Sequence, residues 1–272
     1  MSFRVEMRGT GIMLVTLDRP KRLNALTQAM KRDLIELTAR AQMDDAVRVV
    51  VFTGEGKAFC AGDDLRGYSD DAPSSVPRIG AGHGTPIGSA NALRVYSQAL
   101  NLAVRNLDKI TIAAINGPAI QTGLSLALSC DFRIGANEAR LGSATLRFGL
   151  MPDEGGHYLL LQHLGLAGTL DFLLRTRIVD AREALSLGLI NEIAPDLMTC
   201  TMALAEELAN GPQVAMRMLK RSVYQAAESD FAQALEDIAV RTAVTDHHAD
   251  AKEGAKSFTE KRQPRFNEWL ER

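Results

Sequence analysis

The amino-acid sequence predicts an α/β fold that is followed by a helical C-terminal part. Short β-branched runs, typical of buried strands, alternate with segments of helical periodicity over the first 136 residues. After residue 160 the pattern is almost entirely helical. The chain has 272 residues and 46% hydrophobic content, which suffices for one large domain with a sizeable core. We therefore expect ββα units that form a twisted sheet covered by helices.

The N-terminal elements follow from local signals. Phe3–Arg8 and Ile12–Leu17 flank Gly9-Thr10-Gly11, which predicts a β-hairpin. Thr27 is a suitable N-cap for a helix that runs to about Gln42, because its hydroxyl can accept from the first free N–H groups. Three further β-branched runs predict buried strands: Val47–Thr53, Lys109–Ile115 and Asp131–Ala136.

The C-terminal part contains amphipathic segments that need a partner surface. These segments are Thr199–Ala209, Pro212–Ala227 and Phe231–His247, and a short basic segment, Thr259–Arg272, closes the chain. We therefore divide the chain into a core of residues 1–200 and a helical segment of residues 201–272.

Composition excludes several classes of function. The net charge of −2 gives no long-range attraction to nucleic acid or to an anionic membrane. Cys60, Cys130 and Cys200 are far apart and predict neither a disulfide framework nor a metal site. No apolar run reaches the roughly 20 residues of a membrane-spanning helix. The expectation is a soluble cytoplasmic protein without a nucleic-acid or membrane partner.

Two segments end in glycine-containing turns that are suited to holding an oxyanion. They are Lys57–Leu65 and Ile115–Leu124. Glycine lets the backbone approach a ligand closely. Two turns that each direct one backbone N–H at the same point form an oxyanion hole, which stabilises an enolate or a tetrahedral anion.

An ordered set of motifs resembles the crotonase superfamily, the enoyl-CoA hydratase/isomerase family. The motifs span nearly the whole chain: Leu17-Asp18-Arg19-Pro20 with Asn24-Ala25-Leu26, Phe59 to Leu65, Ala114 to Gly117 with Ser129-Cys130-Asp131, Gly149 to Gly156, Ala181 to Ala184 with Gly188-Leu189-Ile190, and Phe258 to Arg262. The resemblance implies a crotonase-like core, a spiral of ββα units, with a C-terminal helical trimerisation segment. It also implies a homotrimer or a dimer of trimers.

The resemblance assigns the two oxyanion donors to the backbone N–H groups of Asp63 and Thr122. The family usually has a glycine triplet at the second turn, whereas this chain has Gln121-Thr122-Gly123. Thr122 still supplies an N–H and opens an apolar helical segment, although its β-branched side chain crowds the site. A site that has lost catalysis is the alternative. The Asp63 side chain is expected to turn away from the substrate.

The candidate acids differ from those of a hydratase. The two glutamates of the family's hydratases match Ser125 and Thr145 here, so hydration has poor support. Isomerases that resemble this chain use a single acid, and Glu154 stands at the matching place. The neighbouring Asp153 is an alternative, because some members place the acid one position earlier. A third alternative is that both acids only cap the helix that starts near Gly156.

The resemblance further implies contacts with coenzyme A, which is part of the substrate rather than a separate cofactor. The implied residues are Lys21, Arg22, Ala25, Ala61, Asp63, Asp64, Leu65, Arg66 and Lys261. Asp64 also suits a role in stabilising its turn. Residues 67 to 89 are rich in Gly, Pro and Ser and are interpreted either as a lid or as a surface insertion.

Three functions remain open from the sequence. The first is Δ3-Δ2 isomerisation of an enoyl-CoA through a thioester enolate, with Glu154 as the proton shuttle. The second is enoyl-CoA hydration. The third is binding of an acyl-CoA thioester without turnover, which the altered triplet and the missing glutamate pair suggest.

Overall fold

The computed structural model describes residues 2–64 and 85–271, and its strands form two sheets. The larger sheet has the order β1-β2-β3-β4-β6-β9, in which only β1 and β2 pair antiparallel. The smaller sheet has the order β5-β7-β8. The bounds are β1 Phe3–Arg8, β2 Ile12–Leu17, β3 Val49–Gly54, β4 Ile110–Ile115, β5 Pro118–Ile120, β6 Phe132–Gly135, β7 Arg140–Gly142, β8 Ile178–Asp180 and β9 Glu192–Ile193.

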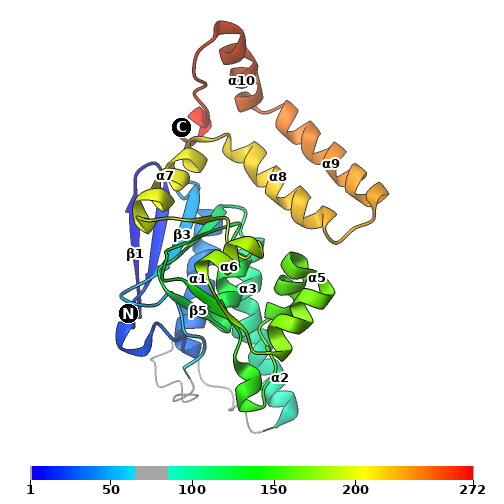
Figure 1. Ribbon diagram of the computed structural model, residues 1–272. Coiled ribbons are helices and arrows are strands. Elements are labelled where there is room, and N and C mark those ends of the chain that lie inside the picture. Colours follow the sequence, from blue (N-terminus) through cyan, green and yellow to red (C-terminus); the bar gives the residue numbers. More distant parts are fainter. Residues whose placement is uncertain (1, 65–84, 272) are drawn as a thin grey trace.

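Helices cover both faces of the larger sheet (Figure 1). Their bounds are α1 Gln28–Met43, α2 Pro86–Val95, α3 Ser97–Asn106, α4 Thr122–Ser129, α5 Gly156–Leu174, α6 Ala181–Ser186, α7 Leu197–Asn210, α8 Gln213–Ala226, α9 Phe231–Asp246 and α10 Ala249–Glu260. Short 3-10 helices span Pro20–Arg22, Thr145–Phe148 and Glu268–Glu271.

The central strand β3 explains why the sheet is buried on both faces. All six of its residues are buried. Because successive side chains point to opposite faces, Val49 and Val51 pack with α7, whereas Val50 and Phe52 pack with α1, α3 and α4. This confirms the prediction that a continuous β-branched run marks a strand covered on both sides.

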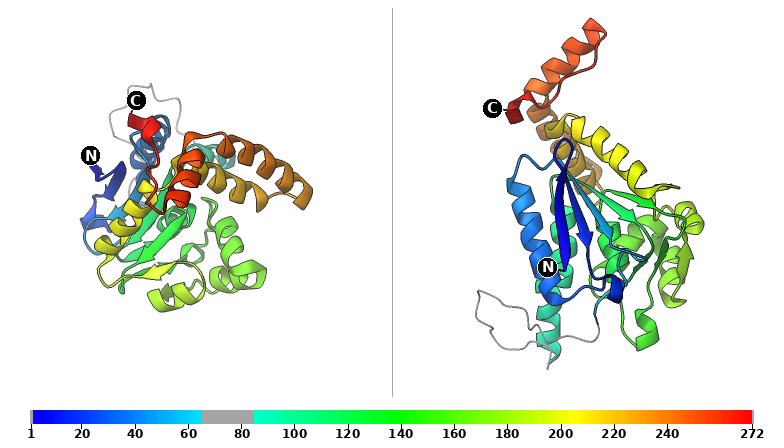
Figure 2. Two further views of the ribbon diagram at one scale, coloured as in Figure 1. Left: turned by 90° about the horizontal axis from the view of Figure 1, so that it is seen from above. Right: turned by 90° about the vertical axis from the view of Figure 1, so that its left-hand side faces the viewer.

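Helices α8, α9 and α10 form an arm that rises from one end of the body (Figures 1 and 2). The base of the arm is tied to the sheet by a buried ion pair, because Lys220 Nζ in α8 donates to Asp131 Oδ2 at 2.7 Å. Tyr224 Oη donates to the other oxygen of Asp131, also at 2.7 Å. Helix α7 crosses the predicted boundary at residue 200 and packs on the sheet, so the arm itself begins with α8.

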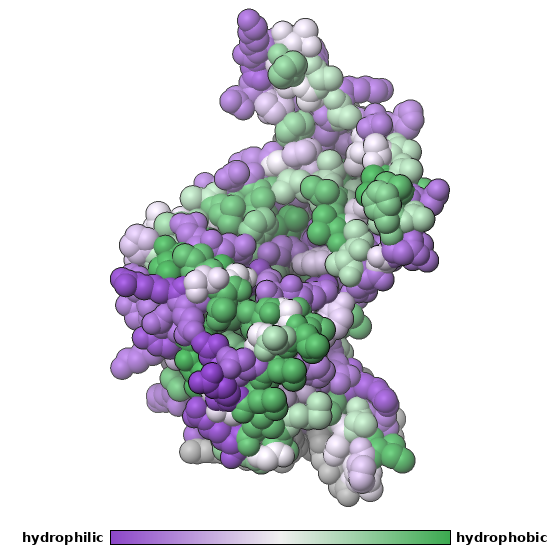
Figure 3. Space-filling view, turned by 45° about the vertical axis from the view of Figure 1, so that its right-hand side comes forward, coloured by the Kyte–Doolittle hydropathy of each residue, from purple (hydrophilic) through white to green (hydrophobic). Residues whose placement is uncertain are grey.

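Hydrophobic side chains remain exposed on the arm and on the part of the body below it (Figure 3). On α8 and α9 they include Leu219, Val223, Ile238 and Val244. On α5 they include Leu161, Leu166, Leu170 and Leu174.

The short basic segment Thr259–Arg272, which was expected to belong to the helical C-terminal part, is mostly not helical. Helix α10 ends at Glu260, and Lys261 adopts a left-handed conformation with φ 53°. Pro264 follows three residues later and cannot continue a helix, because its ring clashes with the preceding turn. Among the described residues beyond this point, only the 3-10 turn Glu268–Glu271 is helical. No described helix is long and apolar enough to cross a membrane.

Candidate active site

The two glycine-containing turns lie against each other because their backbones pair. Cys60 N donates to Pro118 O at 3.0 Å, and Ile120 N donates to Cys60 O at 2.9 Å. Helix α4 begins at Thr122, two residues after the paired Ile120. A Cβ on Gly123 would lie 2.2 Å from Cys60 O, so no other residue fits there without moving the backbone.

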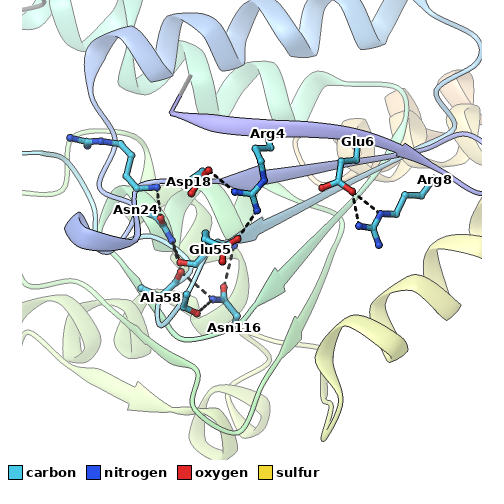
Figure 4. Close-up of polar contacts among 11 residues, drawn as sticks. Arg4, Glu6, Arg8, Asp18, Asn24, Glu55, Ala58 and Asn116 are labelled. Carbon is cyan, nitrogen blue, oxygen red and sulfur yellow. Dashed lines mark hydrogen bonds and ion pairs between the residues drawn. The ribbon is translucent and has the colours of Figure 1, made fainter.

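Two asparagines hold the loop that leads into the first turn (Figure 4). Asn24 Nδ2 donates to the carbonyl oxygens of Glu55 and Ala58 at 2.9 and 2.7 Å. Asn116 Nδ2 donates to Gly56 O and Ala58 O at 2.9 and 3.2 Å. Asn24 comes from the segment before α1 and Asn116 is the residue after β4, so two segments far apart in the sequence fix this turn.

The two predicted oxyanion donors come together at this junction. Thr122 Oγ1 donates to Asp63 Oδ1 at 2.7 Å. Thr122 is the first residue of α4, where an N–H has no acceptor within the helix. Among the described residues, neither Thr122 nor Asp63 uses its backbone N–H in a hydrogen bond. The preceding residue, Gln121, has φ 52°, a conformation that is uncommon outside glycine and often found at functional sites.

A cavity of about 390 Å³ opens beside this junction. It lies between the start of α1, helices α2 and α3, and the turn before α5. The lining residues are Leu26, Thr27, Gln28, Lys31, Asp63, Asp64, Ser89, Ala92, Leu93, Tyr96, Ser97, Leu150 and Asp153. The cavity is therefore lined largely by polar and charged side chains, among them three aspartates and one lysine, with Leu26, Ala92, Leu93 and Leu150 as its apolar part.

The Asp63 side chain faces this cavity, contrary to the expectation that it turns away. Lys31 of α1 explains the difference, because its Nζ donates to Asp63 Oδ2 at 2.8 Å. The same Nζ donates to Ser97 Oγ of α3 at 2.7 Å. Lys31 is almost fully buried, at 3% exposure. Lys31 could not be singled out from the sequence, because a lysine on an amphipathic helix usually points to solvent.

Asp153 lies on the wall of the cavity. Its peptide carbonyl accepts from Gln98 Nε2 at 2.8 Å, and its N–H donates to Glu154 Oε2 at 2.9 Å. Burial raises the pKa of Asp153 to about 7, with further upward contributions from the carboxylates of Glu154 and Asp63; Lys31 acts in the opposite direction.

Glu154 points into the interior behind that wall. It is 2% exposed and is not among the residues that line the described cavity. Its carboxylate accepts from Ser125 Oγ at 2.7 Å, from Gln121 Nε2 at 3.0 Å to both oxygens, and from the Asp153 N–H. Asn101 Nδ2 also donates to its carbonyl oxygen at 2.9 Å. Polar groups therefore surround this carboxylate.

Ser125 and Thr145, which match the glutamate pair of a hydratase, both belong to this interior network. Ser125 contacts Glu154 directly. Thr145 Oγ1 donates to Gln121 Oε1 at 3.1 Å, and Ser143 Oγ donates to the same oxygen at 2.6 Å. Gln121 thus links Thr145 and Ser143 to Glu154, whereas Ser125 needs no such link. The sequence held no signal for Gln121 beyond its place in an altered triplet.

The residues predicted to contact coenzyme A are only partly brought together. Lys21 and Arg22 are exposed in the 3-10 helix that comes just before Leu26 and Thr27 of the cavity wall in the sequence. Ala25 is buried next to Leu26 in the chain. Asp64 pairs with Arg19 at 2.7 Å, which supports its role in the turn. Ala61 N donates to Leu23 O at 2.9 Å, so the first turn is also joined to this segment.

The remaining residues predicted to take part in binding lie at three places along the chain. Leu65, Arg66 and most of the predicted lid, residues 67 to 84, lie outside the described residues. Residues 86 to 89 begin helix α2, which lines the cavity. Lys261 caps α10 in the arm, at the opposite end of the molecule from α2 (Figures 1 and 2). The fold of a single chain therefore does not bring Lys261 to this cavity.

Comparisons with known proteins agree with this fold. A family model described as enoyl-CoA hydratase/isomerase matches residues 7–269. The chain belongs to this family. Membership of the crotonase superfamily, which the motifs suggested, is therefore confirmed. The enoyl-CoA hydratase/isomerase assignment covers nearly the whole chain rather than the site alone.

Individual relatives in the enoyl-CoA hydratase/isomerase family carry two kinds of name. A putative enoyl-CoA hydratase of Thermus thermophilus is 34% identical over 96% of this chain and 100% of its own length. The 1,2-epoxyphenylacetyl-CoA isomerase of Escherichia coli is 31% identical over 98% of both chains. The crystal structure of a putative enoyl-CoA hydratase from Streptomyces coelicolor superposes with a TM-score of 0.89, at 33% identity, over 98% of this chain and 94% of that one. The α/β crotonase fold is thus confirmed, and the protein is an acyl-CoA enzyme of the hydratase/isomerase type.

Proposed function

We propose that this enzyme is a Δ3-Δ2 enoyl-CoA isomerase whose proton shuttle is Asp153. The observation that carries the proposal is the contrast between the two neighbouring acids. Asp153 lines the cavity and has its pKa raised to about 7, whereas Glu154 is buried and accepts hydrogen bonds from three groups. A base with a pKa near the working pH transfers protons most effectively.

One accessible carboxylate suffices for this reaction. The ionised Asp153 removes a proton from C2 of a 3-enoyl thioester, and the electrons move to the thioester oxygen to form a dienolate. The N–H groups of Asp63 and Thr122 are suited to stabilise that oxygen, because Thr122 also lies at the positive end of α4. Asp153 then returns the proton to C4, the double bond moves to C2–C3, and the carboxylate is regenerated.

Glu154 takes the role of a positioning residue in this proposal. Its carboxylate holds the Asp153 N–H and raises the pKa of the Asp153 side chain through its negative charge. Gln98 and Asn101 of α3 donate to the backbone carbonyl oxygens of Asp153 and Glu154. The sequence-based preference for Glu154 as the shuttle has less support, because Glu154 is buried and does not line the described cavity.

Enoyl-CoA hydration is the second candidate, since the names of most of the relatives favour it. A two-carboxylate hydration needs a pair of acids around one water molecule, and the matching side chains here are the hydroxyls of Ser125 and Thr145. Both are engaged with Glu154 and Gln121.

A paired assay separates the two reactions. Purified protein is given 3-hexenoyl-CoA, and the appearance of conjugated enoyl absorbance reports isomerisation. The same protein is given crotonyl-CoA, and loss of that absorbance reports hydration. We expect isomerisation with a turnover number of about 1–1000 per second and little hydration. Rapid hydration without isomerisation would contradict the proposal.

We also propose that the protein assembles as a homotrimer or a dimer of trimers through the arm. Support comes from the exposed apolar residues of α8 and α9, which a single chain leaves uncovered. Light scattering coupled to gel filtration tests this, with Leu219→Glu and Val223→Glu as variants. We expect a trimer or hexamer for the native chain and smaller species for the variants; a native monomer would contradict the assembly.

A further inference from the structure

The cavity contains an ion pair that the proton transfer of Asp153 does not use. Lys31 Nζ and Asp63 Oδ2 are 2.8 Å apart, and the lysine side chain is 4% exposed whereas the aspartate is 27% exposed. Burying a lysine without a partner is costly, so this pairing explains why Lys31 remains inside. Ser97 Oγ accepts a further hydrogen bond from the same ammonium.

Asp63 creates an electrostatic problem for an oxyanion hole. Its backbone N–H is one of the two donors, while its own carboxylate faces the same cavity. An uncompensated carboxylate at this place repels the negative charge that develops on the thioester oxygen, and the repulsion is strong where water is excluded. The Lys31 ammonium balances the charge of Asp63 and donates to its Oδ2. The Thr122 hydroxyl donates a hydrogen bond to Oδ1.

The bond between Asp63 and Thr122 has a second consequence. It joins the side chains of the two residues whose N–H groups form the hole, across the junction of the two turns. A β-branched residue at position 122 therefore contributes a hydroxyl that fixes the turns relative to each other. Ser97 and Lys31 extend this chain of contacts to α3 and α1.

We propose that Lys31 and the Thr122 hydroxyl are positioning residues of the oxyanion hole, and that both act through the Asp63 carboxylate. Lys31 cancels the charge of that carboxylate, and Thr122 sets its orientation. The inference rests on the oxyanion hole of the proposed function, although it does not depend on whether the enzyme isomerises or hydrates.

The proposal predicts an order among charge variants. Lys31→Met leaves Asp63 uncompensated, so enolate formation should fall about 10- to 100-fold, within the range known for loss of one oxyanion contact. Asp63→Asn removes the unfavourable charge itself and should cost less. The double variant Lys31→Met/Asp63→Asn has neither charge and should regain most of the loss seen in Lys31→Met.

A pH profile separates this electrostatic role from a structural one. The charged groups that act on Asp153 are Glu154 on its own segment, Asp63 on the first turn and Lys31 on α1. Removal of Lys31 should raise the pH at which Asp153 becomes active, and removal of Asp63 should lower it. Thr122→Val changes no charge and should leave the midpoint in place while lowering the rate; Thr122→Ser keeps the hydroxyl and should restore the rate.

The experiment measures exchange of the C2 protons of butyryl-CoA in D2O by NMR, together with the Kd of butyryl-CoA by calorimetry. Exchange reports enolate formation alone, so it does not require the isomerase reaction. The matched control is Lys220→Met, which breaks a buried lysine–aspartate pair far from the cavity. Thermal melting of every variant reports how much of each effect is lost stability.

We expect Lys31→Met to lower the exchange rate at saturating butyryl-CoA with little change in Kd, and the double variant to recover. Lys220→Met should lower the melting temperature without moving the pH midpoint. Additive losses in the double variant, or a midpoint that Lys31→Met does not move, would overturn the proposal. Absence of exchange by the native protein would overturn it together with the oxyanion hole, whereas exchange without isomerisation would overturn only the proposed function.

Discussion

The cavity wall and the interior directly behind it hold neighbouring acids in opposite environments. Asp153 lies on the wall, where burial and nearby carboxylates raise its pKa to about 7. Glu154 lies one residue later in the interior, where Ser125, Gln121 and a backbone N–H donate to its carboxylate. Asp153 thus borders the cavity with a raised pKa, whereas the Glu154 carboxylate is engaged by three hydrogen-bond donors. The comparison teaches that reactivity here follows from hydrogen-bond partners rather than from the type of side chain.

The largest expected effect concerns Asp153 and turnover. Asp153→Asn keeps the shape of the side chain but removes the base, so kcat for 3-hexenoyl-CoA should fall by about 10²- to 10⁴-fold. Affinity for a non-reactive acyl-CoA should remain nearly unchanged, as measured by calorimetry. Glu154→Gln is the matched variant and should lower kcat by less than Asp153→Asn. A greater loss in Glu154→Gln would reverse the roles of the two acids.

The same two substitutions should change stability in opposite directions. The pKa of Asp153 is about 7 in the folded protein, against about 3.9 in an unfolded chain. A raised carboxyl pKa means that ionisation opposes folding, so stability is lost as pH rises from about 4 to 7. At pH 8, Asp153→Asn should therefore raise the free energy of unfolding by about 1–2 kcal/mol, because solvent screening at this partly exposed side chain reduces the effect of the full pKa shift. Urea unfolding at pH 4 and pH 8 checks this, and a stabilisation equal at both pH values would contradict it.

Glu154→Gln should destabilise the protein at neutral pH. The amide offers one acceptor oxygen where the carboxylate has two, so at least one donor loses its partner. We expect a loss of about 1–3 kcal/mol, the usual range for hydrogen bonds to a charged group. The measurement is the urea midpoint at pH 7, with Asp153→Asn in parallel. Unchanged stability would mean that the interior network does not hold this carboxylate.

The smallest effects are expected at the two hydroxyls of the network. Ser125→Ala removes a direct donor to Glu154, whereas Thr145→Val acts only through Gln121. Ser125→Ala should cost about 1 kcal/mol of stability, and Thr145→Val should cost less. Both should keep most of the isomerase activity. A loss of activity in Thr145→Val as large as in Asp153→Asn would instead favour a direct role for position 145.

Much of the fold could be predicted from local patterns. The hairpin strands Phe3–Arg8 and Ile12–Leu17 and the Thr27 cap agree with the structure, because alternation, β-branching and capping are local signals. The helical C-terminal part expected over residues 201–272 does not extend through its basic end, and Pro264 was a visible sign against a helix there. Helix α10 was not predicted, although Ala251, Ala255 and Phe258 recur at helical spacing within it.

The site could be predicted only as far as the two turns. Their glycines and their order along the chain are visible in the sequence. The directions of Asp153 and Glu154 are not, because they depend on Gln98 and Asn101, which reach the turn from a helix more than 50 residues earlier. Lys31 was missed for the same reason, since its partner Asp63 lies 32 residues away.

The pH dependence of kcat/KM for isomerisation tests the central claim most directly, because it reports the pKa of the essential base in the free enzyme. If Asp153 is that base, kcat/KM should fall below a midpoint of about 7. Glu154→Gln should move this midpoint to lower pH, because the negative charge beside Asp153 is removed. A midpoint near 4, where an unperturbed carboxyl titrates, and unmoved by Glu154→Gln would contradict the assignment of Asp153 as the tuned proton shuttle.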